Sequence, residues 1–215
     1  IPMSYIETIR EIIAQEWAMF QSTQNAGGRA PCQDDHATFY AMRFGQFAAW
    51  SEEARVSYLA DLTCAGDTGR NLVAEKYLRM MEFTCPEAYA AQRSLLPPLT
   101  TEQRALADRL CDEMICQTVR LRQAFPLIGG AGRPLYSRED TPCGTSVETY
   151  ERGELYTYSL QTLQALQRQL EHLEEQGLTL PGEILRNTVK SYGYDSLEAA
   201  EAGFSQRTAD GKEER

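Results

Sequence analysis

The sequence predicts an all-α protein, a single globular bundle of several helices with a long irregular loop at about 126–145. Three observations predict this class. Apolar residues recur at spacings of three and four, strand-like alternation is almost absent, and no segment repeats at a period of 20–50 residues. The 215 residues, 42% of them hydrophobic, are enough for one core. We expect one helical domain at 3–204 and a disordered tail at 205–215.

Four helices are predicted in the N-terminal half, and most have a recognisable start. An aspartate, Asp34 or Asp35, precedes the second helix and Ser51 precedes the third, and each can accept a hydrogen bond from a free backbone amide. Glycine and proline between the first two helices end the first. These helices are expected at 6–20, 37–50, 52–64 and 70–83.

Proline, glycine and capping residues divide the C-terminal half. Pro86 and Pro181 fit the first turn of a helix, where the missing amide costs nothing. Thr100 and Gln103 form a capping box, and Gly177 ends a leucine-rich helix whose leucines indicate core or a seam for a partner helix. The predicted helices lie at 86–93 and 101–125, from about 146, at 160–173, from 181 and from about 195.

Charge and hydropathy exclude several classes of protein. The net charge is −10, the pI is near 4.8 and no run of Lys and Arg occurs, which argues against a nucleic-acid partner. No apolar run approaches the ~20 residues that a membrane-spanning helix needs, and no signal-peptide pattern is present. We therefore expect a cytoplasmic protein with neither a nucleic-acid nor a membrane partner.

The six cysteines are expected to be free thiols, because there is no secretion signal and no CxxC pair. Cys111 and Cys116 lie on different faces of their predicted helix and do not share a metal site. Residues 32–36 place Cys32 beside two aspartates and a histidine, so a metal site or a cysteine nucleophile there stays open as a minor alternative. We predict no metal, and cofactor and catalytic residues stay unknown.

The predicted helix at 37–50, ATFYAMRFGQFAAW, carries a single charge, Arg43, inside an apolar arc together with Gln46. The remaining circumference is made of small residues, so the helix is expected to be buried on nearly every side. A buried guanidinium without a partner costs roughly several kcal/mol, and an acidic group from the protein or from a ligand should therefore contact it. Lys76 is a second cation within an apolar helix face.

The segment 126–145 contains three prolines and four glycines and is a candidate site, since long loops in compact domains tend to be functional. Its glycine run, 129–132, could hold an anion or be a flexible linker, because it follows a helix and meets a proline. Arginines near it could clamp a carboxylate or phosphate, but Glu148, Glu151 and Arg152 fall on one turn of the predicted helix and could equally form a local salt-bridge lattice. The ligand-binding candidates are Arg43, Gln46, Asp34, Asp35, Arg70, Lys76, Arg133, Arg138, Glu148 and Arg152.

Six segments resemble one known family. They are EWAMF at 16–20, GGRAPCQDD at 27–35, MRFGQFAAW at 42–50, GRNLVAEKYLRMM at 69–81, GRPLYS at 132–137 and SVETYERGELYTYS at 146–159. Over about 5–195 the chain resembles a family of bacterial proteins described as a domain of unknown function. Its members often occur beside, or fused to, a nucleotidyltransferase-like domain, so the resemblance implies a role near small-molecule or nucleotide metabolism. The resemblance supplies no catalytic residue.

Three hypotheses follow. The leading one is a protein that binds a small anionic metabolite in a polar site within the core, with enzymatic activity left open; Arg43→Met would then keep the fold and lose the ligand. The alternative is a helical interaction module that docks on a nucleotidyltransferase-like or other partner protein through the helix at 160–173. The third is purely structural and pairs Arg43 with Asp34, Asp35 or Glu16.

Overall fold

In the computed structural model, which describes residues 3–24, 28–141 and 144–213, helices are joined by short turns. The all-α prediction is confirmed, because these residues form helices and contain no strand, only an isolated bridge between Thr141 and Gly144. The α-helices are α1 (Tyr5–Ser22), α2 (His36–Ala49), α3 (Glu52–Asp67), α4 (Leu72–Thr84), α5 (Pro86–Gln92), α6 (Thr101–Ala124), α7 (Pro126–Gly130), α8 (Val147–Leu155), α9 (Leu160–Glu175), α10 (Leu180–Ser191) and α11 (Leu197–Glu213).

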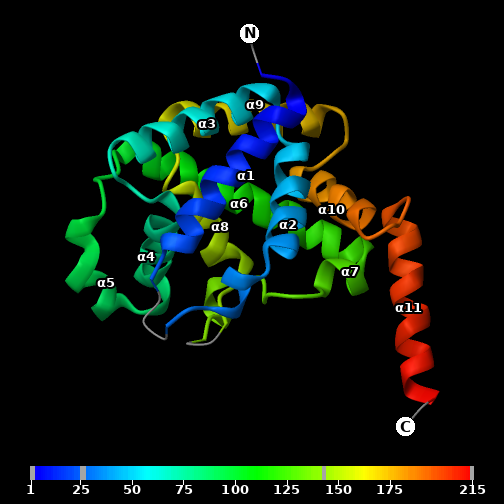
Figure 1. Cartoon of the computed structure of the whole chain (residues 1–215). Coiled ribbons are helices and arrows are strands. Elements are labelled where there is room, and N and C mark those ends of the chain that lie inside the picture. Colours follow the sequence, from blue (N-terminus) through cyan, green and yellow to red (C-terminus); the bar gives the residue numbers. More distant parts are fainter. Residues whose placement is uncertain (1–2, 25–27, 142–143, 214–215) are drawn as a thin grey trace.

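The helices form a bundle around a shared apolar core (Figure 1). Helix α2 lies alongside α10, α1 contacts α2, α3 and α4, and α8 packs between α4 and α6. Phe47, Ile12 and Leu163 are among the side chains with no exposed surface, and they come from three different helices. This arrangement brings α1, α2, α4, α8 and α10 around one region, where the candidate site lies.

Capping residues position the helices as the sequence indicates. Of the two candidate aspartates, Asp35 caps α2, with Oδ1 accepting from the amide of Thr38 at 3.0 Å. Ser51 caps α3, and Thr100 and Gln103 form the predicted capping box of α6. Each cap satisfies an amide that has no partner within its helix.

The leucine-rich helix α9 belongs to the core. Leu163, Leu166 and Leu170 are buried, and Leu160 and Leu173 are partly buried against the same cluster. No leucine face is left exposed on this helix for a partner. Docking through it, as the interaction hypothesis requires, therefore loses its structural basis.

The segment 126–145 is more regular than predicted. Pro126 begins the short helix α7, and Ser137–Glu139 forms a 3₁₀ turn. The reason is tertiary: both carboxylate oxygens of Glu201, on α11, accept from the amides of Leu127 and Ile128 at 2.9 Å each. Ile128 is buried against apolar residues of α10 and α11. Residues 142–143 lie outside the described part.

Helix α11 projects from the rest of the bundle at the right of Figure 1 and continues to Glu213. It therefore runs through most of the segment 205–215 in which the composition predicts disorder, and 214–215 lie outside the described residues. The boundary between a domain at 3–204 and a tail stays a prediction.

Gly153 lets α8 approach α4 closely. A Cβ at this position would lie 2.5 Å from Cγ of Met80 and 3.2 Å from the carbonyl oxygen of Lys76, which is backbone and cannot move independently of α4. We expect Gly153→Val to lower the free energy of unfolding by about 2–3 kcal/mol in denaturant titrations, because overpacking forces the helices apart. Gly66→Ala is the control, since nothing lies within 4 Å of the added Cβ and alanine favours the helix. A loss under about 0.5 kcal/mol for Gly153→Val would contradict the tight approach.

Candidate functional site

A pocket of about 440 Å³ opens between α1, α2, α4, α8 and α10. This volume lies within the range of small-molecule sites. Apolar and aromatic side chains form most of its walls, and the rings of Phe20 and Phe39 stack with centroids 5.5 Å apart. The main wall residues are Phe20, Phe39, Met42, Val73, Tyr77 and Ile184.

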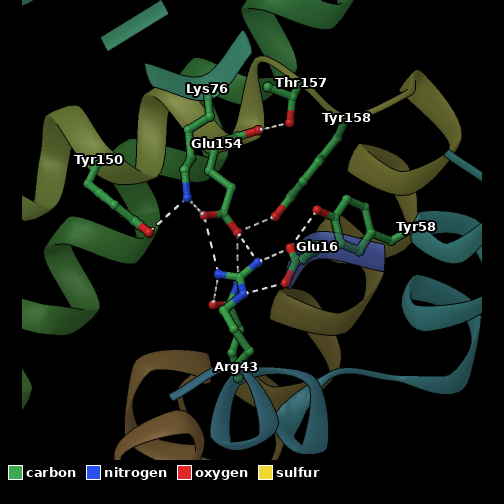
Figure 2. Close-up of polar contacts among 9 residues, drawn as sticks. Glu16, Arg43, Tyr58, Lys76, Tyr150, Glu154, Thr157 and Tyr158 are labelled. Carbon is green, nitrogen blue, oxygen red and sulfur yellow. Dashed lines mark hydrogen bonds and ion pairs between the residues drawn. The ribbon is translucent and has the colours of Figure 1, made fainter. Parts of the chain in front are cut away.

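The floor of the pocket is a buried ion network centred on Arg43 (Figure 2). Its Nε donates to Glu16 at 2.7 Å, and one terminal nitrogen donates to both Glu16 and Glu154, the latter at 2.9 Å. The other terminal nitrogen donates to Gln46 at 2.8 Å and to Glu154 at 3.4 Å. These contacts use all five N–H groups of a guanidinium. Arg43 therefore has no donor left for a ligand.

Lys76 extends the network from α4. Its Nζ donates to the hydroxyl of Tyr150 at 2.7 Å and to Glu154 at 3.2 Å, and it lies 4.3 Å from the centre of the Tyr150 ring. Two further tyrosines, Tyr58 and Tyr158, donate to Glu16 and Glu154 at 2.7 Å each (Figure 2). Two cations thus face two carboxylates, and the four side chains balance one another in charge.

Each of the four charged groups is less than 9% exposed. Burial by itself would raise the pKa of the Glu154 carboxyl, but the charges of Arg43 and Lys76 outweigh it and keep that pKa well below its usual range. Burial would lower the pKa of Lys76, whereas Tyr150 and Glu154 raise it above its usual value. Glu154 and Lys76 therefore stay charged across the ordinary pH range.

Glu151 is the exception among the acids of the pocket. It lines the cavity from α8 but makes no hydrogen bond or ion pair with any residue that the structure describes. Burial, together with the charge of Glu154, raises the pKa of Glu151 to about 7 in spite of the nearby cations. A carboxyl with this pKa in a concave site marks a candidate functional residue. The sequence analysis places Glu151 in a polar cluster but does not name it as a site residue. The feature that could have identified it is the helix face that it shares with Tyr150 and Glu154.

Five of the residues predicted from the sequence line this pocket. Arg43, Gln46 and Lys76 belong to its floor, and Asp35 lies at the start of α2. Arg133 comes from the loop before α8, donates to the carbonyl of Thr145 at 3.0 Å and lies over the Tyr150 ring. It is exposed and has no ion-pair partner among the described residues. The structure thus brings Arg43, Lys76 and the loop together.

The other predicted residues lie elsewhere, where most of them bind protein groups. Arg70 forms a bidentate salt bridge with Glu75. Asp34 pairs with Arg29, and Arg138 lies over the ring of Tyr136. None of these three arginine and aspartate candidates lines the pocket.

Glu148 and Arg152 form a salt-bridge lattice on the side of α8 that faces α6. Arg152 contacts Asp108 at 2.6 Å, Asp112 at 3.0 Å and Glu148 at 3.2 Å. Glu148 also accepts from the amide of Ser137 at 2.7 Å. The lattice interpretation therefore describes these two residues, and the clamp interpretation does not.

Among the residues that the structure describes, cysteines and acidic side chains form no metal centre. The described cysteines are unpaired thiols, and Cys143 lies outside the described residues. Within the described ranges no three side chains of His, Cys, Asp or Glu come together as a metal site. Cys32 is exposed and lines the pocket near Asp35.

No helix among the described residues combines the length and apolar character needed to cross a membrane.

Fold and site together define an all-helical protein with an aromatic-walled pocket above a buried ion network. A model of the family described as Protein of unknown function (DUF4125) matches residues 6–202, and the chain belongs to this family. The family resemblance drawn from the sequence is therefore confirmed, while the bacterial origin and the nucleotidyltransferase-like neighbour stay predictions. No curated protein and no solved structure matches the chain.

Proposed function

We propose that this protein binds a small organic molecule whose apolar, planar body lies between the aromatic walls and whose anionic group contacts Arg133. The observation that carries the proposal is the pocket, concave and about 440 Å³ in volume, with polar groups at the floor and mouth. Such a combination is typical of small-molecule sites.

Arg133 is the cation best suited to an anionic group. The donors of Arg43 are all used by protein groups, and Lys76 has used two of its three protons. Arg133 uses one terminal nitrogen for Thr145, so the planar fork retains donors that match a carboxylate or phosphate. Arg43 then has a structural role, in which it holds the side chains of the pocket floor in place.

This proposal joins two of the hypotheses drawn from the sequence. The structural hypothesis pairs Arg43 with an acid, and Glu16 is one of its partners. The ligand hypothesis needs a cavity beside that pair, which the pocket supplies. The proposal leaves open whether the protein is an enzyme.

The first test uses benzoate, an aromatic anion, followed by protein NMR at millimolar concentrations. We expect shifts confined to pocket residues such as Phe39 and Tyr150, and a roughly five- to tenfold weaker affinity in Arg133→Ala, since a charge-assisted hydrogen bond is lost. Arg138→Ala is the matched control, an exposed arginine of the same loop that stacks on a ring outside the pocket. Absence of binding, or equal weakening in both variants, would overturn the proposal.

A further inference from the structure

We propose that Glu151 accepts a hydrogen bond from an N–H group of the bound molecule, so that the ligand is an amphoteric aromatic compound with an acidic group and an amine-like group. The inference rests on the proposed function and goes further by naming the ligand class. It also predicts that binding releases a proton near neutral pH.

Among the described residues, Glu151 has no hydrogen-bond or ion-pair partner. Each polar group of the floor is already engaged: Arg43 contacts Glu16 and Glu154, and Lys76 contacts Tyr150 and Glu154. Glu151 lines the same cavity and makes no hydrogen bond or ion pair within the described ranges. Glu151 is only partly buried and keeps some contact with water, which a ligand that fills the pocket would displace. A carboxylate that loses water without gaining a donor is destabilised, so a donor supplied by the ligand would be favourable.

The groups around Glu151 explain why its pKa is raised. Burial and Glu154 raise its pKa to about 7, and Arg43 and Lys76 act in the opposite direction. Helix α10 contributes Ile184 and Thr188 to the pocket, neither of which titrates. The other titratable or charged groups that line the pocket are Glu16 on α1, Cys32 before α2, Asp35 and Arg43 on or at α2, Lys76 and Tyr77 on α4, Tyr150 on α8, and Arg133 in the loop. Glu154, also on α8, contacts Lys76 beneath them.

Near pH 7, Glu151 is therefore a mixture of the acid and the carboxylate. A cationic N–H group that binds beside it favours the carboxylate, and the proton passes to the buffer. From a pKa of about 7, the ionised fraction rises from roughly a tenth at pH 6 to roughly nine tenths at pH 8. The affinity for a cationic probe should follow this fraction.

Benzamidine, an aromatic cation with N–H donors, is the probe, measured by calorimetry in buffers of different ionisation enthalpy. We expect roughly tenfold tighter binding at pH 8 than at pH 6, with proton release at pH 7. In Glu151→Gln the affinity at pH 8 should fall about tenfold and lose its pH dependence. Benzoate should still bind Glu151→Gln, and Glu174→Gln, an exposed acid on α9, should behave as wild type.

Thermal unfolding of Glu151→Gln without any probe gives an independent result. The folded pKa of Glu151 exceeds the ordinary value of 4.5, so its contribution to stability falls as pH rises from about 4.5 to about 7 and levels off above that. The variant should therefore melt higher than wild type at pH 8 and close to it at pH 5. A melting temperature below wild type at pH 8 would show that Glu151 is paired, and would overturn the inference.

The outcomes separate the two proposals. If benzoate binds through Arg133 while benzamidine is insensitive to Glu151→Gln, the inference fails and the proposed function stands. If neither probe binds the wild-type protein, both fail.

Discussion

Arg43→Met is expected to lower the free energy of unfolding by about 3–5 kcal/mol, because it leaves Glu16 and Glu154 buried without their main cation. The guanidinium makes five hydrogen bonds to Glu16, Gln46 and Glu154, and the two carboxylates are buried, with 2% and 4% of their surface exposed. Chemical denaturation at pH 7 measures the loss. The sequence alone suggested a variant that keeps its fold and loses only a ligand, and the geometry changes that expectation.

Arg10→Met is the control for this variant. Arg10 lies exposed on α1, and its replacement should change the free energy of unfolding by no more than about 0.5 kcal/mol. A loss of under 1 kcal/mol for Arg43→Met would mean that the two carboxylates are reached by solvent or take up protons at little cost, and the description of a buried network would be wrong.

Glu154→Gln is expected to cost about 3 kcal/mol at pH 7, since it removes the carboxylate that Arg43 and Lys76 share and presents an amide donor to their N–H groups. The pKa of Glu154 is lowered in the folded protein, so its contribution is present above the ordinary value of 4.5 and is lost as pH falls below it. The difference in stability between wild type and variant should therefore shrink on acidification from pH 7 toward pH 3. Glu174→Gln should show no such change.

Combining Glu154→Gln with Glu151→Gln tests whether the two carboxylates interact. The negative charge of Glu154 is one of the causes that raise the pKa of Glu151, so this pKa should fall when Glu154 is replaced. The ionised Glu151 can then act as a counter-ion for Lys76. The double variant Glu151→Gln/Glu154→Gln lacks this substitute, so its loss should exceed the sum of the two single effects by about 1 kcal/mol or more. Additive losses would show that the two carboxylates do not interact.

Local patterns were enough to predict much of the fold. Apolar spacing and caps predicted most of the α-helices, and Asp35, Ser51 and Thr100 occupy the capping positions because a cap involves neighbours within four residues. Helix α7 was missed for the complementary reason: its free amides bind Glu201, more than 70 residues away. Close helix contact at Gly153 is equally invisible in a sequence, where this glycine reads as a weak point in a helix.

The sequence by itself determined that Arg43 must meet an acid, since a lone guanidinium in an apolar helix is too costly to bury. Only the tertiary structure decided which acids these are. Glu16 was among the alternatives, but Glu154 lies 111 residues from Arg43 in the chain and is selected by the packing of α8 against α4 and the rest of the bundle. That same packing satisfies Arg43 completely and leaves Glu151 and Arg133 facing the pocket with unused hydrogen-bonding groups. Hydrophobic period and capping act within a few residues, whereas charge pairing in a core depends on which helix faces meet.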